Sequence, residues 1–268
     1  MKNGVHRRQS CDANRDSDRP HLPTVLAQTG NLGPRTTFIN DDIVVIDGFL
    51  SPKESRFVRE ELEVTFWEPS LTYQPQPSGV YENRLLPFRV SESAQQMWFG
   101  DEVIGALDRI EKRLESIFRL EASYLEQWQA TRYERQGKFD YHLDAGYWGE
   151  HHAGERILTF VLNLETASRG GGTHFRALDI YVEPRAGRLL IWNNLFPSGD
   201  ADHRMIHSST PLLRGKKTTL VSWLRQKQFR LPDVSPAEKK NSHGQARQES
   251  RQHRQRDRKE VRVGDRSE

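Results

Sequence analysis

A histidine and an aspartate stand two residues apart in the segment FDYHLDAGYW, as His142 and Asp144. Side chains of a β-strand alternate between its faces, so this spacing directs both potential metal ligands to one point if the segment is a strand. A third ligand type, His207, follows 63 residues after Asp144. Two imidazoles and one carboxylate are the set that holds non-haem Fe(II) with open coordination positions. The three residues indicate a metal site, although the two-residue spacing alone also arises by chance.

Three further side chains suit the binding of an anion beside such a metal. Lys217 lies ten residues after His207, and Tyr133 lies nine residues before His142. Thr173 follows the glycine turn in SRGGGTHF, where a strand is expected to start. An ammonium group can pair with the distal carboxylate of an oxoacid whose other end chelates iron, and hydroxyls can hydrogen-bond the same carboxylate. These residues predict a co-substrate anchor.

The chain after Leu120 predicts the scaffold that these residues require. Its short runs are rich in β-branched and aromatic residues and are separated by Gly, Pro and Asp clusters, as in RILTFVLNLE, ALDIYVEP and KTTLVSWLRQ. Such runs are typical of antiparallel strands. Several strands that close on themselves form a sandwich or jelly roll, and we expect this catalytic β core at about 121–228.

Two helices are expected before the β core. Ile43–Ile46 is a short apolar run that predicts a buried strand. The SPKE segment at 51–54 combines a capping box with proline at the first helical position and predicts a helix to about residue 64. Apolar residues in 101–118 recur three and four apart, which predicts a second, amphipathic helix. The fold class is therefore mainly β with flanking N-terminal helices (α+β).

The two ends of the chain differ in composition from its middle. Residues 236–268 contain ten Lys or Arg, six Asp or Glu and no aromatic residue. Such a segment buries too little apolar surface to offset the entropy of ordering it. The first residues are similarly polar and interrupted by Pro and Gly. We expect a disordered leader at 1–36, one domain at 37–232 and a disordered basic tail at 233–268.

The positive net charge of +3 comes from these ends. Residues 1–36 carry +3 and residues 236–268 carry +4, which leaves −4 for the middle. Nucleic acid is therefore an expected partner only through weak, salt-dependent contacts of the tail. The single cysteine, Cys11, excludes an intramolecular disulfide, and no apolar run approaches the roughly 18 residues that span a membrane. These features predict a soluble, cytoplasmic protein with no membrane partner.

Four segments, in this order, resemble the prolyl 4-hydroxylase-like branch of the 2-oxoglutarate- and Fe(II)-dependent dioxygenases: RYERQGKFDYHLD, RILTFVLNL with GGGTHF, VEPRAGRLLIW, and SGDADHRMIHSSTPLLRGKKTTLVSWLR. The resemblance spans about 43–225 and implies a double-stranded β-helix, the jelly roll of that family. It implies iron ligation by the two histidines and the aspartate, and 2-oxoglutarate binding by the lysine, tyrosine and threonine. It also implies roles for an arginine near the substrate groove and a tryptophan in the co-substrate pocket. These catalytic and binding residues are His142, Asp144, His207, Arg156, Tyr133, Thr173, Lys217 and Trp223.

The sequence departs from the family at two places near the site. The family often has glutamate where Gly172 stands, and small residues including glycine where Ser208 and Ser209 stand. We expect neither departure to touch a ligand. The segment 73–89, YQPQPSGVYENRLLPFR, lies where the family's peptide-binding loop is expected but does not follow a recognisable pattern. The loop after the ligands, AGYWGEHHAGER, is the expected substrate-facing segment.

The resemblance implies an oxidoreductase that uses Fe(II), 2-oxoglutarate and O₂, with ascorbate as a family feature, and that produces succinate. It favours hydroxylation of a prolyl or other side chain in a peptide or protein. A free amino acid or a natural-product scaffold is the alternative substrate; an aromatic-rimmed groove favours a peptide, and a closed pocket with an extra arginine favours a small acid. The substrate, the position of hydroxylation, the oligomeric state and the role of the tail stay open.

Other readings of the same residues remain. A non-catalytic jelly-roll metal binder has no use for Lys217, Tyr133 and Thr173. A nucleic-acid demethylase of the same superfamily usually has a pair of arginines after the distal histidine, where this chain has lysine. Further histidines are less suited to bind metal, because they lie in predicted loops or on strand faces that the sequence does not assign: His151, His152, His174 and His203.

Overall fold

The computed structural model describes residues 35–75 and 81–230 of the chain. The predicted tail, Cys11 and all but two residues of the predicted leader lie outside these ranges, as does part of the segment 73–89. No helix among the described residues is long and apolar enough to cross a membrane. The description below therefore concerns the predicted domain.

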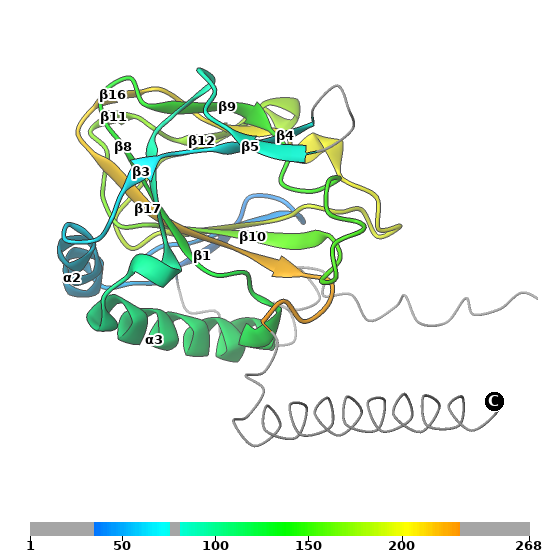
Figure 1. The fold of residues 1–268 in the computed structure, drawn as a ribbon, viewed down its shortest axis with the longest axis horizontal. Helices are drawn as coiled ribbons and strands as arrows, with labels where there is room; N and C mark the ends of the chain where they lie inside the picture. Colours follow the sequence, from blue (N-terminus) through cyan, green and yellow to red (C-terminus); the bar gives the residue numbers. More distant parts are fainter. Residues whose placement is uncertain (1–34, 76–80, 231–268) are drawn as a thin grey trace, which may run out of the picture. The chain divides into compact units, whose positions relative to one another are not determined.

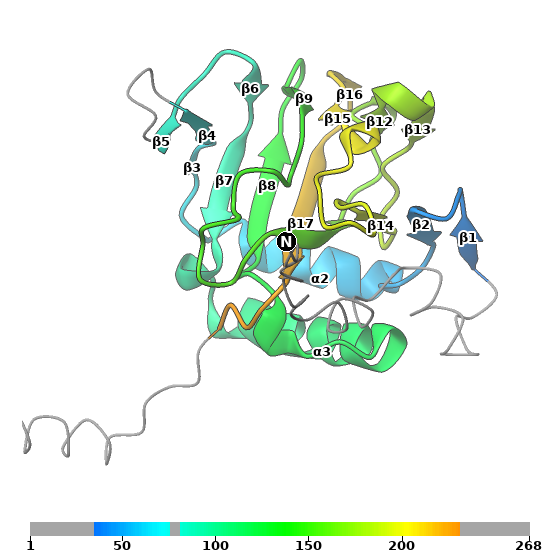
Figure 2. The same ribbon diagram turned by 90° about the vertical axis from the view of Figure 1, so that its right-hand side faces the viewer.

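The larger of two facing sheets has eight strands, and neighbouring strands in it are antiparallel (Figures 1 and 2). Its central strands are the longest of the sheet, and both faces of these strands are mostly buried. In spatial order the strands are β1 (Thr36–Phe38), β2 (Ile43–Ile46), β14 (Leu189–Asn193), β10 (Arg156–Asn163), β17 (Lys217–Arg225), β8 (Gln129–Tyr133), β7 (Glu92–Gln95) and β3 (Glu68–Pro69).

The smaller sheet lies over one face of the larger one and has five strands, also antiparallel. In spatial order they are β13 (Ile180–Val182), β12 (Thr173–Phe175), β15 (His207–Ser209), β9 (Lys138–His142) and β6 (Arg89–Val90). Two short ribbons complete the strands, namely β11 (Arg169–Gly170) with β16 (Leu212–Arg214) and β4 (Thr72–Pro75) with β5 (Tyr81–Arg84). Two antiparallel sheets packed in this way confirm the predicted jelly roll.

Two helices pack on the outer face of the larger sheet, α2 (Pro52–Leu62) and α3 (Asp101–Phe118) (Figure 2). Ser51 caps α2: its hydroxyl accepts a hydrogen bond from the Glu54 backbone, and the Glu54 carboxylate accepts one from the Ser51 backbone. Both predicted helices are confirmed, and α2 ends two residues before the expected position. The described residues also contain short 3-10 turns: Gln96–Trp98 and Ala122–Tyr124 flank α3, and Arg176–Leu178 and His203–Met205 lie between strands.

Alternation along β10 divides the interior into two parts. Phe160 and Leu162 point to the helices and join the main apolar core, in which Phe118 of α3 packs edge-on against Phe160. Thr159 and Val161 point to the opposite face, between the two sheets, where a cavity lies. Because the helices seal one face of the larger sheet, the other face is available to form a site with the smaller sheet.

Candidate active site

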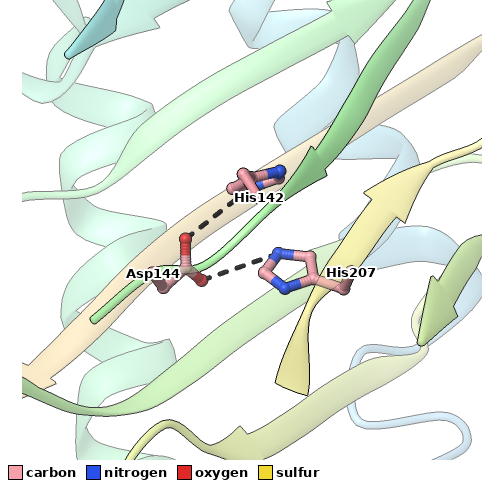
Figure 3. Close-up of side chains that lie close together, drawn as sticks. All are labelled: His142, Asp144 and His207. Atoms are coloured by element: carbon pink, nitrogen blue, oxygen red, sulfur yellow. Dashed lines mark ion pairs between the residues drawn. The ribbon is translucent and has the colours of Figure 1, made fainter. Parts of the chain in front are cut away.

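The three predicted metal ligands converge between the sheets. His142 is the last residue of β9 and His207 the first of β15, and the two are cross-strand partners. Asp144 follows β9 by two residues, and its carboxylate oxygens lie 3.7 Å from His142 Nε2 and 3.8 Å from His207 Nε2. One ligand atom from each residue lies within 4.8 Å of the others (Figure 3). This arrangement can hold a single metal ion.

Hydrogen bonds fix which nitrogen of each histidine faces the centre. His142 Nδ1 lies 2.9 Å from the Asp140 carbonyl oxygen, and His207 Nδ1 lies 2.9 Å from the Met205 carbonyl oxygen. A carbonyl only accepts, so both Nδ1 atoms carry hydrogen and donate. In the neutral rings both Nε2 atoms then have a lone pair directed toward Asp144, as metal ligation requires.

The protonation states also suit a cation. Burial, together with the neighbouring His207 ring, lowers the pKa of His142 to about 3, so the imidazole is neutral at neutral pH. The pKa of Asp144 also lies below its usual value; burial raises it, but the neighbouring histidines, Arg156 and a hydrogen bond from Thr159 lower it further. His142 and Asp144 are therefore already deprotonated, which is the form in which they bind a metal.

Two consecutive buried hydrogen bonds hold the Asp144 carboxylate in place. Thr159 Oγ1 donates to Asp144 Oδ2 at 2.7 Å, and Asn194 Nδ2 donates to Thr159 Oγ1 at 2.8 Å. Thr159 and Asn194 are both buried. Sequence reasoning missed them, because Thr159 and Asn194 are far from Asp144 in the chain and approach it only through the order of the strands in the sheet.

The metal ligands open onto a cavity of about 610 Å³ between the sheets. The predicted anchor residues line the same cavity: Tyr133, Thr173 and Lys217. Lys217 and Tyr133 are cross-strand partners on β17 and β8, and the Lys217 Nζ lies 4.7 Å from the centre of the Tyr133 ring. Lys217 Nζ donates a 2.8 Å hydrogen bond to the hydroxyl of Ser209. The structure thus places the expected anchor beside the expected metal site.

Burial gives the anchor unusual titration behaviour. Lys217 is 3% exposed, and burial lowers its pKa from 10.5 to about 7. Within the described ranges, no carboxylate lies within ion-pair distance of its amine. Burial raises the pKa of Tyr133, so its hydroxyl stays protonated. An incoming carboxylate would meet a buried amine and a hydroxyl that can both donate to it.

Arg156 and Trp223 lie together on another wall of the cavity. The Arg156 guanidinium is 3.7 Å from the centre of the Trp223 ring and makes two hydrogen bonds to Glu126, at 2.6 and 2.8 Å. Both residues line the cavity, as does Arg89, whose guanidinium packs on Phe139. Sequence reasoning did not single out Glu126 or Arg89, since neither belongs to a motif with a recognisable spacing.

The remaining histidines lie outside the metal cluster found among the described residues. The His151 and His152 rings pack near Phe229, in the loop after the ligands. His174 lies 2.6 Å from the hydroxyl of Tyr141, and His203 is exposed in a 3-10 turn. In the same loop as His151, Tyr147 and Trp148 line the cavity.

Comparison with known proteins shows what this chain is similar to. Residues 128–225 match the model of the 2OG-Fe(II) oxygenase superfamily. Prolyl 4-hydroxylase subunit alpha-1 of Gallus gallus is 33% identical over 153 residues, which cover 54% of this chain and 29% of that protein. Prolyl 4-hydroxylase 13 of Arabidopsis thaliana is 29% identical over 142 residues, covering 47% of this chain and 52% of that protein. The chain thus spans between about a third and about half of these relatives.

A solved structure shares the fold. An oxidoreductase of the 2OG-Fe(II) oxygenase family from Burkholderia pseudomallei superposes with a TM-score of 0.50 at 12% identity, covering 86% of this chain and 100% of that one. At this identity the likeness concerns the fold alone. It agrees with the two facing sheets described above.

Proposed function

We propose that this chain, whose residues 128–225 match the model of the 2OG-Fe(II) oxygenase superfamily and which is similar to prolyl 4-hydroxylases, is a 2-oxoglutarate- and Fe(II)-dependent dioxygenase. It is then an oxidoreductase that hydroxylates an unactivated C–H bond. One observation supports the proposal most strongly. A centre of two histidines and one carboxylate lies in the same cavity as a buried lysine that has no carboxylate partner among the described residues.

The residues fit Fe(II). Two neutral imidazoles and one carboxylate form the donor set typical of non-haem iron, and the histidine Nε2 lone pairs face the same point. In our proposal His142, Asp144 and His207 hold the ion. Bound Fe(II) with 2-oxoglutarate supplies the oxidising chemistry, in which O₂ is consumed and 2-oxoglutarate is converted to succinate and CO₂.

The chain's own residues bind and orient the co-substrate. In our proposal Lys217 pairs with the distal carboxylate of 2-oxoglutarate, and Tyr133 and Thr173 donate hydrogen bonds to it. Because Lys217 is buried, the ion pair forms away from water, where it is stronger than at the surface. In our proposal Trp223 lines the co-substrate pocket on another wall of the cavity, together with Arg156, which is held by Glu126 and lies where a substrate would enter. Ascorbate dependence is proposed from family membership alone.

We propose that the substrate is a peptide or protein with a prolyl or other side chain as the reacting group. The relatives' names support it, and so do the aromatic side chains of the cavity wall, Tyr147, Trp148 and Phe229. A free amino acid or other small acid is the second candidate, because the cavity also contains Arg89, for which no described carboxylate lies within ion-pair distance. The single domain at 37–232 and a cytoplasmic location, which rests on cysteine usage, are further proposals.

The test is succinate formation by the purified chain with Fe(II), 2-oxoglutarate and ascorbate. We expect succinate from the wild type and little or none from His142→Ala or Lys217→Ala, since each removes one proposed binding interaction. His152→Ala is the matched control, because this histidine lies outside the metal cluster. Added proline-containing peptides should raise the rate if the substrate is peptidyl. Equal succinate from wild type and variants, with metal still bound, would instead favour a non-catalytic metal binder.

A further inference from the structure

Ser209 occupies the centre of the anchor. Its hydroxyl accepts the 2.8 Å hydrogen bond from Lys217 Nζ, and it also hydrogen-bonds the hydroxyl of Tyr133. Among the described residues, Ser209 is the one hydrogen-bond partner of the Lys217 amine. A serine between the lysine and the tyrosine is thus part of the anchor itself.

Strand geometry explains why Ser209, and not Ser208, takes this place. Residues two apart on a strand share a face, so Ser209 points to the same side of β15 as the ligand His207. Ser208 points to the other side and is not among the residues that line the cavity. The register between β12 and β15 pairs Ser209 with Thr173, so two hydroxyls stand next to each other on the smaller sheet.

The larger sheet supplies a second pair at the same end of the cavity. Lys217 and Tyr133 are cross-strand partners on β17 and β8, and both line the cavity with Thr173 and Ser209. Four donor groups from two sheets therefore surround one space. An ionised carboxylate has two oxygens with about four lone-pair positions, so four donors match its full capacity.

We propose that Ser209 donates a hydrogen bond to the distal carboxylate of 2-oxoglutarate, as a fourth anchor group beside Lys217, Tyr133 and Thr173. This inference rests on the proposed function. Without ligand, the Ser209 oxygen accepts from Lys217; with the carboxylate present, the lysine turns to the stronger acceptor and the serine hydroxyl is free to donate to the same group. This proposal differs from the expectation from the sequence that the departure at Ser209 touches no ligand.

The experiment compares two ligands on the full chain loaded with Zn(II), which holds the ligand site without turnover. Calorimetry measures the dissociation constants of 2-oxoglutarate, which reaches the anchor, and of oxalate, which chelates a metal but has no distal group. For Ser209→Ala we expect 2-oxoglutarate binding to weaken about tenfold or more, as for the loss of a hydrogen bond to a charged group. Oxalate binding should stay unchanged.

Two further variants separate binding from folding. Ser209→Thr keeps the hydroxyl and suits a strand, so it should bind 2-oxoglutarate nearly as the wild type does. Ser208→Ala removes the neighbouring hydroxyl that faces away from the cavity, and it should change the dissociation constant of neither ligand. The inference is overturned if Ser209→Ala binds 2-oxoglutarate as tightly as the wild type does, or if the substitution weakens oxalate binding as much as 2-oxoglutarate binding. If the wild type binds metal but neither ligand, the proposed function fails with it.

Discussion

At the scale of single residues, Lys217 should make the proposed binding of 2-oxoglutarate depend on pH. Burial lowers its pKa to about 7, so above that pH the amine of the ligand-free protein is largely neutral. The carboxylate needs the ammonium form, so binding above pH 7 takes up a proton and weakens as the pH rises. Calorimetry in buffers of different ionisation enthalpy should measure uptake of about one proton per 2-oxoglutarate well above pH 7 and almost none well below it.

Lys217→Arg is the control for this prediction, since arginine stays charged throughout the range. Its binding should show no such proton uptake. A wild type whose proton uptake is the same on both sides of pH 7 would contradict the titration of Lys217. The same shift acts on folding: the unfolded lysine stays protonated up to 10.5 while the buried one loses its proton near 7, so this group makes the ligand-free protein more stable as the pH rises between those values.

Thr159 should control metal affinity without touching the metal. In Thr159→Val, Asp144 Oδ2 loses its buried donor and Asn194 loses its acceptor, so the carboxylate is no longer held in place. We expect the dissociation constant for Zn(II) or Fe(II) to rise about 10- to 100-fold, as is typical for the loss of a group that orients a ligand. Competition with a chromophoric chelator measures it. Thr159→Ser should restore most of the affinity; failure to do so would assign Thr159 a packing role instead.

Sequence reasoning succeeded where short-range geometry decides. Two-residue alternation was enough to bring His142 and Asp144 together, and the spacing after His207 pointed to Lys217. It failed for Thr159, whose role depends on which strands lie side by side. It did not single out Ser209, because the pairing of β15 with β12, which places Ser209 beside Thr173, cannot be read from the sequence.

At the scale of elements, α3 supports the larger sheet while the site lies on the sheet's other face. Leu114 is fully buried in the core between α3 and the sheet. Leu114→Ala should lower the free energy of unfolding by about 2–5 kcal/mol, because it removes apolar contacts and leaves a cavity. Urea denaturation measures the loss. The dissociation constant for 2-oxoglutarate should stay unchanged under conditions where the variant is folded; a large change would mean that α3 shapes the site directly.

The elements themselves were predictable to different degrees. The capping box at Ser51 and the apolar stripe of 101–118 were enough to predict both helices, because the local sequence largely determines where a helix forms and begins. The strands between 68 and 95 were not predicted. They are short and lie at or next to sheet edges, so their sequence shows little alternation. The pairing of β7 with β8 and of β6 with β9 is set by distant parts of the chain.

At the scale of the whole molecule, 2-oxoglutarate should stabilise the fold only when the metal is also bound. Metal ligands and anchor residues come from both sheets, so metal with 2-oxoglutarate binds the folded chain and not the unfolded one. At a ligand concentration about 100 times its dissociation constant, the stabilisation is about 2.7 kcal/mol. We expect a melting temperature several degrees higher with both ligands and a return to the starting value on adding a chelator. An equal rise with 2-oxoglutarate alone would place its binding outside the metal centre.

Under the proposed function, the distribution of binding residues over the two sheets also limits the length of the co-substrate that can bind. Both histidines belong to the smaller sheet, whereas Lys217 and Tyr133 belong to the larger one. An oxoacid must reach both at once, so the spacing of the two layers selects among homologues that differ by a single methylene group. That spacing is kept by the apolar side chains packed between the layers, such as Phe175 against Trp192. Under the proposed function, interior packing residues that bind no carboxylate therefore influence which length of oxoacid fits.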